Sequence, residues 1–213
     1  MIDEGLYEVL ASWADAQDLS GAGVHPVATG YRLLRLDSRL EHHGATVFEI
    51  ALLCDESAEV VYYNRVFLCD FGAKQAAIGL RWRTPEQQHR AATQGITGNV
   101  ISYLARHNTV IVSAGSSRQG GPFFLEAQAS AALRRGNSVQ AYQRTEMLAL
   151  PIGTRAELQQ LKGKMWGAPG GFGNTFVMID DGAAHEPSCS MPLALIDELD
   201  AADIIEMAAL DCD

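Results

Sequence analysis

The stretch ATQGITGNVISYLARHN, residues 92–108, is a glycine-containing turn that runs directly into an amphipathic segment. Ile96, Val100 and Leu104 recur at helical spacing, so one side of a helix here is expected to face a core. Gly95 and Gly98 let backbone N–H groups come close to whatever lies at the helix start. Because these N–H groups are unpaired and carry partial positive charge, we interpret the turn as a phosphate cradle.

The residues after this helix also bear on the interpretation, because a glycine at a helix start often has only a structural role and is weak evidence of a ligand site by itself. TVIVS, residues 109–113, reads as a strand and is followed by the loop AGSSRQGG, residues 114–121. A second helix is predicted over residues 122–135, because Pro122 suits a first turn and Gly136 suits the position just past a helix end.

This order of elements and its residues resemble the coenzyme A-binding half of the GNAT N-acetyltransferase superfamily. The family pattern is Gln/Arg-x-x-Gly-x-Gly/Ala, commonly written RGQGIG. Gln94, Gly95 and Ile96 match it, while Thr97 stands at the second glycine or alanine and Ala92 at the first arginine or glutamine. The segment IVSAGSSRQGGPFFLEA, residues 111–127, is similar to the strand, serine-rich loop, glycine pair and helix of small bacterial and phage-type members. The resemblance covers residues 44–150.

The resemblance implies an α/β (α+β) fold with a mixed, mostly antiparallel central sheet flanked by helices. Residues 46–69 read as an antiparallel hairpin, and residues 76–83 as the strand that splays from its neighbour to admit the pantetheine arm. We expect residues 1–164 to form the acyl-CoA-binding domain. Residues 165–213, with a Gly-rich loop, a strand and an acidic helical tail, are expected to pack on it as an appendage.

Acetyl-CoA is the co-substrate that the resemblance implies, with no metal. Its pyrophosphate is expected on the backbone N–H groups of the cradle, with an arginine near the phosphates. The residues assigned to this role are Gln94, Gly95, Ile96, Thr97, Gly98, Asn99, Arg90 and Arg118.

The charge distribution supports an anionic ligand at this cradle. The net charge is −10 overall, but residues 1–73 carry −8, residues 74–164 carry +8 and residues 165–213 carry −10. The basic block therefore contains the cradle, and a polyanion there is electrostatically favourable. The block would also suit nucleic acid, but the acidic flanks oppose a long polyanion and make that partner the weaker alternative.

An N-acyltransferase needs a polarised thioester carbonyl and a route for the proton of the amine. Backbone N–H groups of residues 78–81 are expected to polarise the carbonyl, and Glu49, Tyr62 or Glu126 to take or relay the proton. Many GNAT enzymes carry a tyrosine early in the second helix to protonate the thiolate, where this chain has two phenylalanines. The substitutes for that acid are Ser116, Ser117 and Tyr142.

The remaining composition is that of an ordinary cytoplasmic protein: 47% of residues are hydrophobic and 20% are charged. No apolar run reaches the length of a membrane span, and residues 1–4 are acidic rather than a basic signal region. The cysteines lack metal-binding or redox spacing, so we expect reduced, structural thiols at Cys54, Cys69, Cys189 and Cys212.

Two functions remain open from the sequence. The first is an acyl-CoA-dependent N-acyltransferase acting on an amine of a small molecule, protein or modified base. The second is a catalytically degenerate GNAT-fold protein that acts by binding another protein, as a regulator, an immunity factor or a host-takeover factor. The tail of residues 193–210 is amphipathic and acidic, which suits either a solvated helix or a docking site for a basic partner through Asp197, Asp200 and Asp203.

Overall fold

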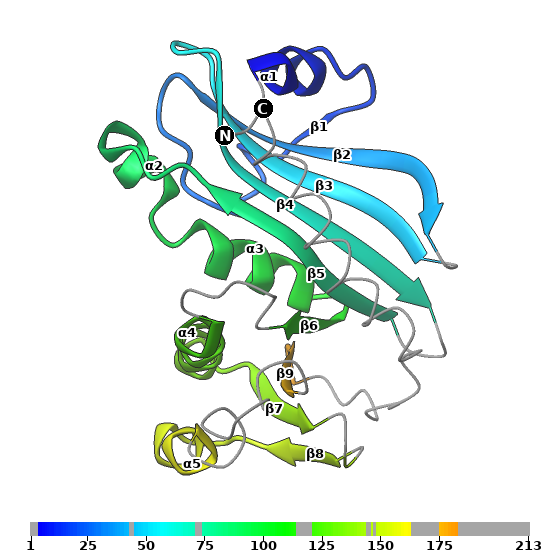
Figure 1. The fold of residues 1–213 in the computed structure, drawn as a ribbon, viewed down its shortest axis with the longest axis vertical. Coiled ribbons are helices and arrows are strands. Elements are labelled where there is room, and N and C mark those ends of the chain that lie inside the picture. The colour runs from blue at the N-terminus through cyan, green and yellow to red at the C-terminus, as the bar shows by residue number, and fades with distance from the viewer. Residues whose placement is uncertain are drawn as a thin grey trace, which may run out of the picture.

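The computed structural model describes residues 4–42, 45–70, 74–113, 121–143, 146, 148–162 and 175–182. These residues form one nine-stranded sheet in the order β1-β2-β3-β4-β5-β6-β9-β7-β8, with helices packed on it (Figure 1). The sheet is mixed and mostly antiparallel, as the sequence predicts, and the one parallel pair among the described strands joins β5 to β6. None of the helices in these ranges combines the length and apolar character needed to cross a bilayer.

The first half of the chain is one helix followed by an antiparallel meander. Its elements are α1 (Glu4–Ala11), β1 (Gln17–Asp18), β2 (Tyr31–His42), β3 (Ala45–Cys54), β4 (Glu59–Asp70) and β5 (Lys74–Arg83). β3 and β4 are the predicted hairpin, and β5 contains the predicted strand at residues 76–83. These strands form because β-branched and aromatic residues alternate or run together between polar turns.

The second half alternates helices and strands. Its elements are η1 (Gln87–His89), α2 (Arg90–Thr93), α3 (Ile96–Ala105), β6 (Thr109–Ser113), α4 (Gly121–Arg134), β7 (Ser138–Gln143), β8 (Leu148–Pro151), α5 (Arg155–Leu161) and β9 (Thr175–Asp180). The helices and strands predicted in this region are confirmed. α5 begins with a capping box, in which Thr154 and Glu157 each bond to the other's backbone N–H.

β9 is an interior strand of the sheet. It lies between β6 and β7 and pairs antiparallel with both. Its sequence, TFVMID, is buried along nearly its whole length, as expected of a strand covered on both faces. This strand falls in the segment that was expected to pack on the domain as an appendage. In the structure it is instead part of the central sheet. The acidic tail at residues 193–210 lies outside the described residues.

Alternation along β3 assigns the two faces of the sheet to two cores. Phe48, Ile50 and Leu52 belong to the core that contains the apolar residues of α3 and α4. Ala51 and Leu53 point the other way and pack with Leu10 of α1. Because successive side chains of a strand alternate between faces, α3 and α4 lie on the opposite side of the sheet from α1 (Figure 1).

Two irregularities in β5 shape the region beside α3. The parallel ladder joins residues 75–78 of β5 to residues 109–112 of β6, and β5 then continues to Arg83 beyond its last partner in β6. On its other edge, Asn64 pairs with Arg81 and Val66 with Ile78, so Arg65 alone opposes residues 79 and 80. This is a β-bulge, which bends the strand and takes a residue out of the regular ladder.

Gly79 is required in this bulge by close packing. A Cβ built on Gly79 would lie 2.5 Å from Cε2 of Phe67 and 3.3 Å from the carbonyl oxygen of Arg65. We expect Gly79→Ala to lower the free energy of unfolding by about 1–3 kcal/mol, the usual cost of overpacking a core. Urea denaturation measures the change. Gly21→Ala is the matched control, because nothing lies within 4 Å of a Cβ there, and an equal loss in both variants would contradict this account.

Candidate functional site

The start of α3 presents unpaired backbone donors. Gly95 is the N-cap residue and adopts a left-handed conformation, with φ of 76°, which glycine tolerates without strain. Asn99 donates its N–H to the carbonyl oxygen of Gly95 at 3.0 Å and so makes the first bond of the helix. The N–H groups of Ile96, Thr97 and Gly98 precede that bond and have no acceptor within the helix. A glycine N-cap has no side chain to cover them.

A pocket of about 430 Å³ lies in front of this helix start, and we call it the β5–α3 pocket. β5 supplies one wall beyond its last pair with β6, the turn and first residues of α3 supply the floor, and α4 supplies the opposite wall. Its lining residues are Tyr62, Arg81, Trp82, Arg83, Thr93, Gly95, Ile96, Thr97, Gly98, Phe124 and Gln128.

A second pocket, of about 390 Å³, adjoins the first, and we call it the arginine pocket. The two pockets share Arg83, Thr93 and Gly95. The residues that line the arginine pocket are Arg83, Thr84, Pro85, Glu86, Gln87, Arg90, Thr93, Gln94 and Gly95. The two pockets therefore flank the helix start and meet at Gly95.

The charges around both pockets favour an anion. Arg81 and Arg83 line the β5–α3 pocket, and none of the described residues of its lining is acidic or a histidine. The guanidinium carbon of Arg81 lies 3.4 Å from the centroid of the Phe124 ring, so the cation stacks on an aromatic wall. Arg90 adds a further positive charge to the arginine pocket, where Glu86 is the one acidic residue among the described lining residues.

Tyr62 is the one tyrosine among the described residues that line the β5–α3 pocket. It is 1% exposed, and its hydroxyl accepts a hydrogen bond from Nδ2 of Asn64 at 3.2 Å and interacts with the side chain of Thr97. Burial raises the pKa of Tyr62, so the phenol keeps its proton at neutral pH. Oδ1 of Asn64 is buried without a hydrogen-bond partner in the described structure.

A buried histidine, His25, contacts the turn before α3 and the first turn of the helix. Nε2 of His25 lies 2.8 Å from the carbonyl oxygen of Ala92, and Nδ1 lies 2.9 Å from Nδ2 of Asn99. A carbonyl only accepts and an amide nitrogen only donates, so His25 is the neutral tautomer with its proton on Nε2. Arg135 at the end of α4 donates to the carbonyl oxygen of Gly98 and to Oδ1 of Asn99. The N-terminal loop and α4 thereby fix the turn.

Most of the residues assigned to coenzyme A from the sequence meet at these pockets. Arg90, Gln94 and Gly95 line the arginine pocket, and Ile96, Thr97 and Gly98 line the β5–α3 pocket. Asn99 does not contribute a free donor, because its N–H serves the helix and its side chain serves His25 and Arg135. Arg118 lies outside the described residues, as do Ser116 and Ser117.

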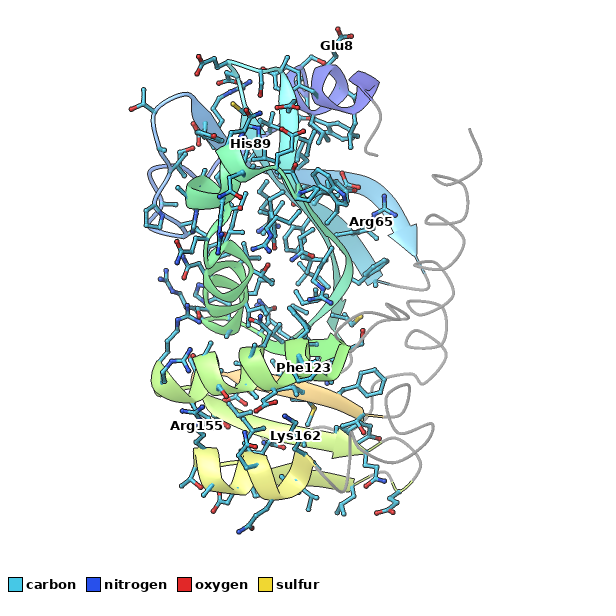
Figure 2. All side chains as sticks on the ribbon, turned by 60° about the vertical axis from the view of Figure 1, so that its left-hand side comes forward. Glu8, Arg65, His89, Phe123, Arg155 and Lys162 are labelled. Carbon is cyan, nitrogen blue, oxygen red and sulfur yellow. The ribbon has the colours of Figure 1, made fainter. Side chains whose placement is uncertain are left out.

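Of the four catalytic candidates, only Tyr62 lines either of these two pockets as the structure describes them. Glu49 lies between Phe48 and Ile50 on β3, so it faces the other side of the sheet, where it pairs with Arg65 at 3.3 Å. Figure 2 shows Arg65 on the side away from α3. Glu126 bonds to Gln159 and Lys162 beside α5, and the Lys162 ammonium holds the pKa of Glu126 below its ordinary value.

Tyr142 and the two described cysteines lie in the cores of the sheet. Tyr142 belongs to the core on the face away from α3 and α4. Cys54 and Cys69 are buried thiols without a disulfide, as expected, and burial raises the pKa of Cys69 to about 11. A thiol with that pKa is protonated at neutral pH and is not an activated nucleophile. Cys189 and Cys212 lie outside the described residues.

Several residues of the site carried no clear signal in the sequence. His25 reads as a solvated loop histidine, yet it is 5% exposed and bonded on both ring nitrogens. Phe124 and Gln128 reach the pocket because they are one helical turn apart on α4, a spacing that the sequence shows without revealing what the turn faces. Searches against protein-family models, curated proteins and solved structures found no match.

Proposed function

We propose that this protein is a GNAT-type N-acyltransferase that binds acetyl-CoA along the two pockets. The observation that carries the proposal is the β5–α3 pocket itself, which opens where β5 runs on past its last pair with β6. The GNAT resemblance implies a splayed parallel strand pair at this point of the fold. Further support comes from the connection β5–α3–β6, which is the order that the resemblance implies for the cradle.

The pyrophosphate is proposed to bind at the start of α3. The donors there are the N–H groups of Ile96, Thr97 and Gly98, and Arg83 and Arg90 flank them in the arginine pocket. A helix N-terminus combined with arginine side chains binds phosphate through both hydrogen bonds and charge. The pantetheine arm would then follow β5 into the β5–α3 pocket.

The acyl carbonyl is proposed to lie against the bulge of β5, where backbone at residues 79 and 80 departs from the regular ladder. A backbone N–H at this place would polarise the carbonyl and stabilise the oxyanion of the tetrahedral intermediate. When the carbon–sulfur bond breaks, the phenol of Tyr62 would donate its proton to the thiolate. The phenol is protonated at neutral pH, as a proton donor must be, although the burial that raises its pKa also makes it a weaker acid.

The acceptor is proposed to enter as a neutral amine or to lose its proton to water. Among the described residues that line the β5–α3 pocket there is no carboxylate or histidine, so none of them is a conventional general base. The same observation favours the second candidate function, a protein of this fold that binds acyl-CoA or a partner protein without transfer. In that case the docking role would fall to the acidic residues of the tail.

Calorimetric titration with acetyl-CoA tests binding of the co-substrate, which the acyltransferase and the acyl-CoA-binding protein would have in common. We expect saturable binding at one molecule per chain, and coenzyme A without the acyl group should also bind, because phosphate contacts dominate. Pantetheine is the matched control, since it lacks the pyrophosphate and should bind far more weakly. Equal binding of pantetheine and acetyl-CoA, or no saturation with either, would refute the cradle. Binding without turnover over a broad panel of amines would instead favour the second candidate.

A further inference from the structure

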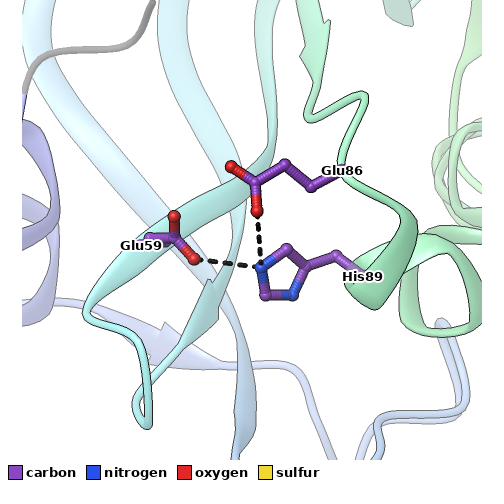
Figure 3. Close-up of side chains that lie close together, drawn as sticks. All are labelled: Glu59, Glu86 and His89. Carbon is purple, nitrogen blue, oxygen red and sulfur yellow. Dashed lines mark hydrogen bonds and ion pairs between the residues drawn. The ribbon is translucent and has the colours of Figure 1, made fainter.

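A polar cluster lies beside the arginine pocket, where η1 approaches the start of β4. His89, Glu59 and Glu86 direct one ligand atom each toward a common region, and these three atoms lie within 4.8 Å of one another (Figure 3). Nε2 of His89 is 2.9 Å from Oε2 of Glu59 and 3.9 Å from Oε2 of Glu86. The imidazole is 4% exposed, whereas the two carboxylate side chains are 40% and 49% exposed.

We propose that Glu59, Glu86 and His89 form a site for a divalent first-row transition-metal cation. One imidazole nitrogen and two carboxylate oxygens are ligands that zinc and manganese accept. Metal–ligand bonds of about 2.1 Å place neighbouring ligand atoms about 3–3.5 Å apart. The observed separations of 2.9 Å and 3.9 Å bracket that range. Nε2 of Gln88 lies 3.0 Å from Nε2 of His89 and 2.8 Å from Oε2 of Glu86, so a cation would take the place of this amide group between the two ligands.

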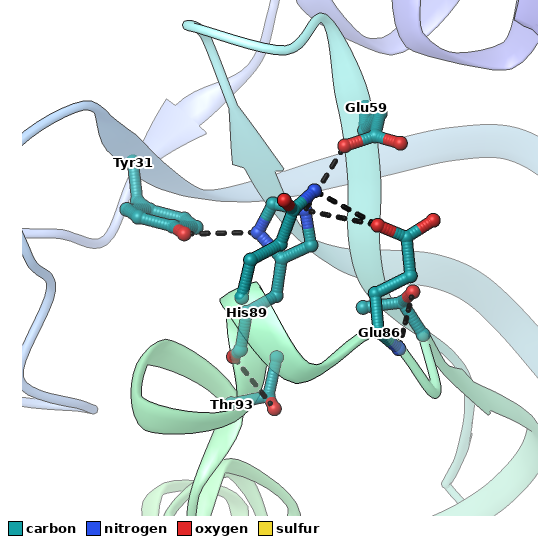
Figure 4. A network of polar contacts seen from close by, with 7 residues as sticks. Tyr31, Glu59, Glu86, His89 and Thr93 are labelled. Carbon is teal, nitrogen blue, oxygen red and sulfur yellow. Dashed lines mark hydrogen bonds and ion pairs between the residues drawn. The ribbon is translucent and has the colours of Figure 1, made fainter.

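The groups around the ligands hold them in the orientation that metal binding needs. The hydroxyl of Tyr31 lies 2.9 Å from Nδ1 of His89 (Figure 4). A metal on Nε2 leaves the imidazole proton on Nδ1, which then donates to Tyr31, the second contact that metal-bound histidines usually make. A hydrogen bond with Ser57 orients the carboxylate of Glu59.

The charge of the cluster gives the site a consequence for the neighbouring pocket. Glu86 also lines the arginine pocket, where Arg83 and Arg90 are the other charged residues in the described part of the lining. With a neutral imidazole the two carboxylates carry a charge of −2, which opposes an anion in that pocket. A divalent cation cancels this charge. No metal is expected from the sequence, where the three residues stand at positions 59, 86 and 89.

Titration of the full chain with Mn²⁺ tests the proposal directly. Binding is measured as the decrease in the electron paramagnetic resonance signal of the free ion. We expect one site that is weakened about 100-fold or more in Glu59→Gln and in Glu86→Gln, because each substitution removes a charged ligand. Glu56→Gln is the matched control, since Glu56 is exposed on the same turn and is not a member of the cluster. Tyr31→Phe should weaken binding about 10-fold by releasing the imidazole.

Comparison of the two glutamine variants with Glu56→Gln shows whether Mn²⁺ binds at this cluster or at other acidic groups of the chain. Both glutamates are partly exposed, so the glutamine variants are expected to keep the fold, which far-ultraviolet circular dichroism checks. If the wild-type protein shows no Mn²⁺ or Zn²⁺ binding, or if both glutamine variants bind like Glu56→Gln, the proposal is wrong. The measurement needs no acyl-CoA, so its outcome is independent of the proposed acyltransferase function.

Discussion

Thr97→Glu is expected to abolish binding of acetyl-CoA without unfolding the chain. Thr97 lines the β5–α3 pocket in the first turn of α3, so a carboxylate there would face the proposed pyrophosphate. Two like charges about 4 Å apart repel by about 4 kcal/mol at an effective dielectric constant of about 20. That energy corresponds to a loss of affinity of about 10³-fold. Calorimetric titration measures it.

The fold should survive because two effects on α3 oppose each other. Loss of the Thr97 contact with Tyr62 costs about 1 kcal/mol, whereas an acidic side chain near a helix N-terminus contributes about 0.3–1 kcal/mol. Thr46→Glu is the matched control, since it makes the same change of charge at an exposed position of β3 away from both pockets. Unchanged affinity in Thr97→Glu would place the phosphates elsewhere.

Tyr62→Phe is expected to reduce the turnover of acyl transfer by about 10²–10⁴-fold while the affinity for acetyl-CoA stays near its original value. A general acid contributes in the transition state and not to binding of the co-substrate. Steady-state kinetics with a reactive amine, together with calorimetry, measures the two quantities separately. The variant also leaves Nδ2 of Asn64 without this acceptor, so we expect a stability loss of about 1 kcal/mol.

Tyr63→Phe is the control for this prediction, because Tyr63 is the next residue of β4 and belongs to the core on the other face of the sheet. It should leave turnover unchanged. Glu49→Gln and Glu126→Gln should also leave turnover nearly unchanged, since neither residue lines either pocket. A large loss in Glu49→Gln with full activity in Tyr62→Phe would move the chemistry to the opposite face.

The sequence alone determined most of the local structure. Glycine and proline positions, the capping pair Thr154 and Glu157, and the apolar spacing of residues 96–104 act within a few residues of where they stand, so they predict helices directly. The strand at residues 109–113 is predicted with its observed bounds for the same reason, since a polar turn precedes a short β-branched run. The phosphate-cradle hypothesis rests on this local information.

Pairing between distant segments decided which candidate side chains share a site. Leu52 pairs with Tyr62, and so these two residues face α3, whereas Glu49 lies three residues from Leu52 and faces away. The register that fixes this relation includes a shift between Leu52 and Leu53, and a shift of one residue exchanges the faces of a strand. Such shifts depend on packing across the sheet and leave no mark in either strand alone.

The place of β9 and the cluster around His89 likewise depend on tertiary structure. β9 lies between β6 and β7 because an apolar strand buried on both faces needs a partner at each edge, and the chain order does not say which edges are open. His89, Glu59 and Tyr31 come from three separate segments and meet only when β2, β4 and η1 pack together. The sequence therefore determined the helix start and its charge, and the packed sheet decided which residues surround it.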